Sequence, residues 1–335
     1  MAQKVFDKIQ FGRQSALTTA VAATTVYPGK ATTWDLDRGY NNPDEDFGRL
    51  DDEQPGRGTF GLRGAAWAIE SELRFEDYMH WPEMHMAGGV TPTGVGPYTW
   101  THTSDSTSLT PKPYTIQMGS EDANDQWQLH GCLATELSMG FDALTAPGNA
   151  PWRVTASGIA LNRAISALTA ALSAPATLET AEGHLTIVKE GTTATAFGSL
   201  TELSASLVSF RFTSTVPYVL LPYGSTSDTA TDRGVEGKAG VTFEAGLKIG
   251  ATSKSNVHDI YNTSGSTVQE RRWSIVVAGS GTKTLTVNAR VRFRTVDRGE
   301  RNGEAIYQIA GSMVYDSTLA GRLQLVGVNS VSVIP

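Results

Sequence analysis

The 335-residue chain has one cysteine, few charged residues and no long apolar stretch. Because Cys132 has no second cysteine to pair with, an intramolecular disulfide is excluded, and with it a disulfide-built secreted scaffold. No stretch reaches the ~18 apolar residues that a membrane-spanning helix needs. The N-terminal segment MAQKVFDKIQFGRQ carries charges and lacks the apolar core of a signal peptide. We therefore expect a soluble protein made in the cytoplasm.

Positive charge is also scarce. The chain has 27 Lys and Arg against 34 Asp and Glu, a net charge of −7, and only 18% of its residues are charged. A protein that binds nucleic acid by neutralising phosphates needs a basic face, so this class is disfavoured, although DNA could still pass without binding. Glycine, serine, threonine and alanine are abundant, which suits strands and turns better than helix bundles.

Two long stretches with period-two alternation dominate the sequence. Residues Trp127 to Phe141 and Lys283 to Val296 alternate apolar and polar side chains, which predicts two long strands with one buried and one solvated face. Cys132 falls on the polar side of the first stretch, where we interpret it as a small strand residue and not a reactive thiol. Shorter alternating segments fill most of the remaining chain, so the predicted fold class is mainly β.

Three short helices are predicted among the strands. FEDYMHW at 75–81 is expected to stop near Pro82, because proline disfavours the helical conformation in the residue before it. RAISALTAALS at 163–173 follows Asn162, a possible helix cap, and is interpreted as a connector between the two halves of the chain. Residues 256–262 form the third. Residues 1–17 are interpreted as an arm, and 88–113 as a turn-rich excursion with a hairpin.

The two halves align with each other in the same order. AWAIESEL at 66–73 matches GVTFEAGL at 240–247, and PYTIQMGS at 113–120 matches RWSIVVAGS at 272–280. The extra residues of the first half fall in an acidic loop, 41–57, and in the 88–113 excursion. This predicts two tandem β-sandwich or barrel-like domains with short flanking helices and long loops, at 1–172 and 173–335.

Patterns that carry chemistry are weak. His80, Glu83 and His85 lie in HWPEMH, which does not have the spacing of a helical zinc site, and Pro82 interrupts the helix. GSGTKT from Gly279 lacks the spacing of a phosphate-binding loop and is predicted to be a hairpin turn. No nucleophile elbow or calcium loop is present. We expect no enzyme activity, catalytic residue, cofactor or metal.

The first half resembles the major tail tube proteins of long-tailed bacteriophages. The similarity lies in SALTTAVAATTVYPG before a long loop, then RGAAWAIESELRFEDYMHW, PYTIQMGSED, the long alternating strand and WRVTASGIALN. It covers most of residues 1–165, and the second half joins through the repeat. The resemblance implies a structural virion protein whose domains form rings, six domains to a ring, stacked into a hollow tube for DNA ejection. With two domains in this chain, a homotrimer would complete a pseudo-hexameric ring by closure.

The resemblance also implies partners: further copies of the chain, a tape measure protein, and tail terminator and tip proteins, with DNA passing through the lumen without specific binding. We expect the acidic loop to contact the neighbouring ring, and the three arginines of RVRFR to lie at subunit contacts or on the outer surface, because cations in the channel would retard DNA. The inter-ring candidates are Asp44, Glu45, Asp46, Asp51, Asp52 and Glu53, and the arginines are Arg290, Arg292 and Arg294.

An alternative function is a receptor- or carbohydrate-binding β-sandwich of a phage tail tip or fibre. It depends on tryptophans as platforms for sugar rings, and the candidates are Trp67, Trp81, Trp100 and Trp152. A β-rich hydrolase is a third possibility, which the absence of a catalytic pattern disfavours.

Overall fold

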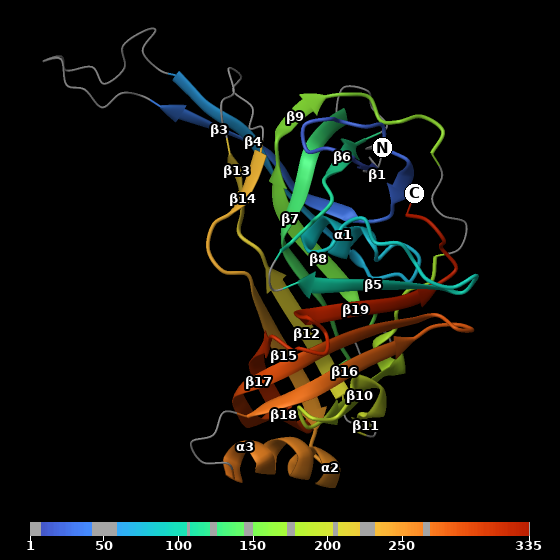
Figure 1. The fold of residues 1–335 in the computed structure, drawn as a ribbon, viewed down its shortest axis with the longest axis vertical. Coiled ribbons are helices and arrows are strands. Elements are labelled where there is room, and N and C mark those ends of the chain that lie inside the picture. The colour runs from blue at the N-terminus through green and yellow to red at the C-terminus, as the bar shows by residue number, and fades with distance from the viewer. Residues whose placement is uncertain are drawn as a thin grey trace, which may run out of the picture.

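The computed structural model describes residues 8–41, 59–105, 108–120, 126–143, 150–172, 178–203, 207–221, 232–263 and 269–334. The fold is mainly β, with antiparallel strands and a few short helices (Figure 1). The elements of the first half are β1 (Lys8–Arg13), β2 (Thr25–Tyr27), β3 (Lys30–Asn41), β4 (Thr59–Glu72), α1 (His80–His85), β5 (Tyr98–Asp105), β6 (Tyr114–Gly119), β7 (Gln126–Asp142), β8 (Arg153–Ala160) and β9 (Asn162–Ile165).

The second half is also built mostly of strands. Its elements are η1 (Gly183–Leu185), β10 (Thr186–Gly191), η2 (Phe197–Ser199), β11 (Thr201–Glu202), β12 (Leu207–Thr215), β13 (Tyr218–Leu221), β14 (Asp232–Val235), β15 (Gly240–Lys248), α2 (Ala251–Ser253), η3 (Lys254–His258), α3 (Asp259–Thr263), β16 (Glu270–Ala278), β17 (Thr284–Arg301), β18 (Glu304–Val314) and β19 (Gly321–Asn329).

One large antiparallel sheet runs through both halves. Its strand order is β3–β4–β8–β7–β12–β15–β18–β17, and the pairing of β7 with β12 joins the halves. Among the described strands, no pairing closes this sheet into a barrel. The expectation of a mainly β fold is confirmed, whereas a barrel is not formed within one chain.

The two long strands β7 and β17 each belong to two layers. The first part of β7 pairs with β6 and β9 in a smaller layer, and its second part pairs with β8 and β12 in the large sheet. Gly131 lies at the change of layer with φ of 65°, and a Cβ there would come within 2.7 Å of the Leu161 side chain. In the same way β17 pairs with β19 over Thr284–Ala289 and with β18 over Arg290–Arg301.

The core lies between the layers and continues from one half to the other. Trp152, just before β8, packs on Phe210 of β12 with ring centroids 5.4 Å apart. Phe210 contacts Phe243 of β15 at 5.8 Å, and Phe243 contacts Trp273 of β16 at 4.9 Å. These side chains belong to one buried cluster. The two halves therefore share one hydrophobic core.

The predicted long strands are confirmed as β7 and β17, and the turn at 279–283 joins β16 to β17 as expected. The placement of Cys132 on the solvated side is wrong. Cys132 is fully buried, because the backbone conformation at Gly131 shifts the alternation as the strand changes layer. Burial raises the pKa of its thiol, which agrees with an inert side chain.

Several local predictions need correction. The helix at 163–173 is wrong: β9 pairs with Trp127–His130 of β7, since a helix this short is marginal alone and loses to tertiary pairing. Helix α1 does not stop at Pro82 but continues through it. A proline is tolerated in the first turn of a helix, because the N–H groups there have no partner within the helix. In the predicted arm, β1 pairs with β2 and β6. In the excursion, the expected hairpin is limited to one antiparallel bridge, between Thr93 and Thr99, and β5 pairs with β19. The helix at 256–262 is confirmed in η3 and α3.

Candidate assembly surface

The solvent-facing side of the large sheet carries small and polar side chains of mixed charge. On β4 and β8, Glu70 and Arg153 form an exposed ion pair at 3.1 Å. The other residues of this face include Ser138, Thr155, Ser157, Thr213 and Thr242, with acidic Glu72, Glu136, Glu244 and Asp297 and basic Arg211, Lys248, Arg292 and Arg301. Charges of the two signs are interspersed, so the face presents no basic track that would hold phosphates.

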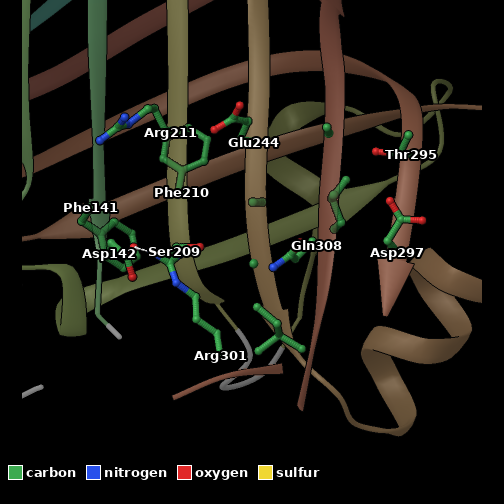
Figure 2. A pocket seen from close by; sticks show the side chains of 15 residues that line it. Phe141, Asp142, Ser209, Phe210, Arg211, Glu244, Thr295, Asp297, Arg301 and Gln308 are labelled. Carbon is green, nitrogen blue, oxygen red and sulfur yellow. Dashed lines mark ion pairs between the residues drawn. The ribbon is translucent and has the colours of Figure 1, made fainter. Parts of the chain in front are cut away.

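A hollow of about 410 Å³ lies at the end of this sheet where β7, β12, β15, β18 and β17 curve together (Figure 2). Arg301, near the end of β17, reaches across it and forms an ion pair of 2.5 Å with Asp142 at the end of β7. Its lining includes Arg211, Glu244 and Gln308 but no histidine or cysteine. The polar groups that line the hollow are hydroxyls, carboxylates, guanidinium groups and an amide.

The ladder between β7 and β12 is the joint between the halves. It runs from Ser209 opposite Asp142 to Thr215 opposite Glu136. The hydroxyl of Thr213 donates to the hydroxyl of Ser138 over 3.1 Å. A Cβ on Gly140 would overlap the carbonyl oxygen of Phe210 on β12. The two backbones approach so closely that only glycine fits at position 140.

Helix α1 fastens this joint from the core side. His85 lies within hydrogen-bond distance of two strands: its Nδ1 is 2.9 Å from the carbonyl of Ala134 on β7, and its Nε2 is 2.8 Å from the hydroxyl of Ser214 on β12. The Tyr218 hydroxyl donates to the carbonyl of His85. Burial lowers the pKa of His85 to about 4, so the ring is neutral, with Nδ1–H donating to Ala134 and Nε2 accepting from Ser214.

Two edges of the large sheet pair with no described strand. One is the edge of β3 away from β4; the other is the edge of β17 opposite β18, from Arg294 to Glu300. At the start of the second edge the hydroxyl of Tyr261, from α3, donates to the carbonyl of Arg294 over 2.7 Å. Unpaired N–H and C=O groups along an edge are ready to pair with another strand.

The three candidate arginines lie where β17 leaves β16. Arg290 and Arg292 both form ion pairs with Glu270, the latter at 2.7 Å, and Arg294 is exposed. Burial alone would raise the pKa of Glu270, but the hydrogen bonds from Arg292 and Arg290 bring it below its usual value. Their place at subunit contacts or on an outer surface stays a prediction. The acidic candidates, Asp44, Glu45, Asp46, Asp51, Asp52 and Glu53, lie outside the described residues.

His80, Glu83 and His85 do not form a metal site. Glu83 accepts hydrogen bonds from Arg13 at 2.7 Å, the Tyr114 hydroxyl at 2.9 Å and the Gly89 N–H at 3.1 Å. Across the described ranges, no three His, Cys, Asp or Glu residues are placed to hold a metal ion. HWPEMH therefore serves to tie α1 to the strands around it.

The tryptophans of the alternative reading are core residues. Trp67, Trp81, Trp100 and Trp152 are at most 1% exposed, so their rings offer no face to a sugar. Reasoning from sequence missed the residues of the joint, above all Gly140 and His85. A usable signal was present: a glycine interrupts each long alternating strand near its end, at positions 140 and 299.

Comparisons with known proteins add no relative. No protein-family model matches the chain, and a search of curated proteins finds no significant similarity. None of the described helices has the length and apolar character needed to cross a membrane.

Proposed function

We propose that this chain is a structural subunit that joins copies of itself into rings, and that the rings stack into the hollow tail tube of a long-tailed bacteriophage, through which DNA passes. In this proposal the chain consists of two tandem tube domains, and three chains close one ring of six domains. The observation that carries the proposal is the order of strand pairing in the two halves.

Seven pairings of the first half have counterparts in the second. In chain order, they are β1–β2 with β10–β11, β1–β6 with β10–β16, β3–β4 with β12–β15, β4–β8 with β15–β18, β6–β7 with β16–β17, β7–β8 with β17–β18, and β7–β9 with β17–β19. The segments 66–73 and 240–247, matched in sequence, lie in β4 and β15, which hold equivalent places. This correspondence supports a duplicated unit.

A local irregularity repeats as well. In the β7–β8 ladder Thr135 is an extra residue, and in the β17–β18 ladder Arg294 is. Next to each bulge is a glycine, Gly158 or Gly311, where a Cβ would overlap a carbonyl oxygen of the long strand. A bulge and its glycine at matching places are hard to obtain from two unrelated β units.

The β7–β12 joint shows how one unit could connect to the next in a ring. It connects one unit to the next edge to edge, and it leaves open the corresponding edges at the two ends of the chain, β3 and β17. Repeating the same step would bring β3 of a second copy against β17. A head-to-tail contact of this kind closes into a ring when the rotation permits, and otherwise forms a filament.

The solvated sheet face suits the wall of a channel for DNA. Its interspersed charges would attract phosphates weakly. Arg292 belongs to this face, so in the proposed ring it would face the channel and not a subunit contact or the outer surface, with Glu270 offsetting its charge. The acidic loop remains our candidate for contact between rings: deleting residues 42–54 should leave folded protein that forms no long tubes. The tape measure, terminator and tip proteins are proposed partners on the resemblance alone.

Electron microscopy of the purified protein tests the proposal directly. As the concentration is raised, negative stain should show rings or stacked rings with a central hole, and native mass spectrometry should show three chains in each ring. A protein that remains monomeric at all concentrations reached, or forms particles without a hole, contradicts the proposal.

A further inference from the structure

We infer which residues meet when two copies join: β17 of one chain receives β3 of a second copy in the register of the β7–β12 ladder, with Gly299 in the place of Gly140. This inference rests on the proposed function and specifies its interface. Three observations carry it: the positions of the bulges, the space around the two glycines, and the hydrogen bond at the bulge carbonyl.

The bulges place β17 on β7 without ambiguity. Matching the extra residues Thr135 and Arg294 gives an offset of 294−135=159. The same offset relates the carbonyls that face the bulge glycines, since Leu133 O lies against Gly158 and Arg292 O against Gly311, and 292−133=159. Adding 159 to Gly140 gives 299, which is also a glycine.

The neighbouring strand requires Gly140, whereas no described backbone atom comes equally close to Gly299. A Cβ on Gly140 would overlap the backbone of β12. The three described atoms nearest to a Cβ on Gly299 all belong to the Gln308 side chain, at 3.3 Å and beyond, and the backbone of Gly299 is not left-handed. An incoming strand placed as β12 is on β7 would need the glycine at 299 for the same reason.

The carbonyl of the bulge residue gives a second match. In the joint, the carbonyl of Thr135 accepts a hydrogen bond of 2.8 Å from the N–H of Val216, just beyond β12. At the open edge the equivalent carbonyl, of Arg294, accepts from the Tyr261 hydroxyl. A side chain thus occupies the position that a strand donor takes in the joint, and it can share the carbonyl with that donor or be displaced by it.

The β3 side of the contact follows from the ladders that lead away from the two bulge glycines. In the first half Gly158 pairs with Trp67, and Trp67 pairs with Trp34. In the second half Gly311 pairs with Phe243, and Phe243 pairs with Phe212, so Trp34 corresponds to Phe212, an offset of 212−34=178. Since Arg211 faces Gly140, 211−178=33 places Thr33 of the second copy opposite Gly299. By the same rule, Thr213 opposite Ser138 places Asp35 of the second copy opposite Asp297.

The first test is the variant Gly299→Ala, with Gly198→Ala as its control. An added Cβ at 198 meets nothing within 4 Å. We expect monomers of both variants to unfold at the wild-type urea midpoint. Ring formation by Gly299→Ala should need at least about 10-fold more protein, because overpacking a close backbone contact is strongly unfavourable. Normal assembly of Gly299→Ala would overturn the inference.

The second test reads the register by disulfide formation. The Thr213 and Ser138 hydroxyls are 3.1 Å apart in the joint, so cysteines at the equivalent positions, Asp35→Cys with Asp297→Cys, should cross-link neighbouring chains after oxidation. The native Cys132 is buried and does not compete. Covalent dimers and closed trimers are expected on a denaturing gel. The pair Asp37→Cys with Asp297→Cys, displaced by two residues, should give none.

The outcomes separate this inference from the proposed function. If wild-type rings form but Gly299→Ala assembles normally, or the displaced pair cross-links and the expected pair does not, the register is wrong while ring formation stands. If the wild-type chain forms no rings and neither cysteine pair cross-links, both proposals fall.

Discussion

The joined edge of β7 and the open edge of β17 have the same backbone bulge but different side chains. Met139 and Phe141 of β7 are buried beside β12, and the equivalent positions of β17 hold exposed Arg298 and Glu300. Apolar side chains bury the joint within the chain. Charged side chains on an open edge are a common way for proteins to protect an edge strand, and in the proposed assembly they would keep monomers apart until many contacts form together.

The elements that follow β4 and β15 show the same contrast. In the first half, His85 of α1 bonds to both strands of the joint. In the second, Tyr261 of α3 bonds to β17 alone, because no second strand is there. Each half therefore has its own helix beside the bulge of its long strand. The contacts of that helix differ between β7, whose edge is paired with β12, and β17, whose edge is open.

The largest effect should come from the core that spans the joint. Phe210→Ala removes a ring that contacts Trp152 and Phe243, and we expect it to lower the free energy of unfolding by about 3–5 kcal/mol. Because the core is continuous, urea unfolding should remain one transition by both tryptophan fluorescence and circular dichroism. Val95→Ala, at a fully exposed side chain, is the control. Two transitions, with only one shifted, would show that the halves unfold separately.

Next in size is the contrast between two glycines. Gly140→Ala places a Cβ against the β12 backbone and should destabilise the monomer by about 1–3 kcal/mol. Gly299→Ala should change monomer stability by less than about 0.5 kcal/mol. Urea midpoints of the two variants, measured on dilute monomer, give the comparison. Equal losses of monomer stability would mean that both glycines are needed within one chain, although only the edge at Gly140 is paired.

The sequence predicted the strands better than their partners. Period-two alternation identified β7 and β17 and the matched segments in β4 and β15, because one face of each strand is buried and the other is wet. It could not place Cys132, because the left-handed Gly131 locally reverses the alternation. It also missed β9, whose residues favour a helix by their local pattern but pair with β7 in the fold. The joint was missed because His85 and Ser214, 129 residues apart, become neighbours only through the fold.

The third prediction concerns pH at the joint. His85 has a folded pKa of about 4 against 6.5 for a free side chain, so between these values the unfolded chain binds the proton and the folded chain does not. Its contribution to stability is full above pH 6.5 and is lost as the pH falls toward 4. His85→Gln should be less stable than wild type at pH 7, and the gap should narrow by about 1–2 kcal/mol at pH 5.

Comparing the variant with wild type isolates His85 from other buried groups. His80 and His102 also have pKa values lowered by burial, to about 3, and Asp77 has its pKa raised by burial to about 7 with the opposite effect on stability. These groups are present in both proteins, so they cancel in the difference. A gap that stays the same from pH 7 to pH 5 would contradict a neutral His85 in the joint.

The smallest effect should come from charge at the open edge. In the inferred register Asp297 lies opposite Asp35 of the second copy, and like charges directly opposite each other weaken strand pairing by roughly 0.2–1 kcal/mol. Asp297→Asn should therefore lower the protein concentration at half-assembly by about 1.5- to 5-fold. The equivalent pair in the joint, Thr213 and Ser138, is uncharged and hydrogen-bonded, so the substitution makes the open edge more like the joined one.

Glu202→Gln, an exposed acid on β11, controls for net charge, and analytical ultracentrifugation at 50 and 500 mM salt measures the assembly of both variants. The advantage of Asp297→Asn should shrink at high salt, because screening already weakens the repulsion that the variant removes. An equal gain from Glu202→Gln would mean that general repulsion between chains, and not this strand contact, limits assembly.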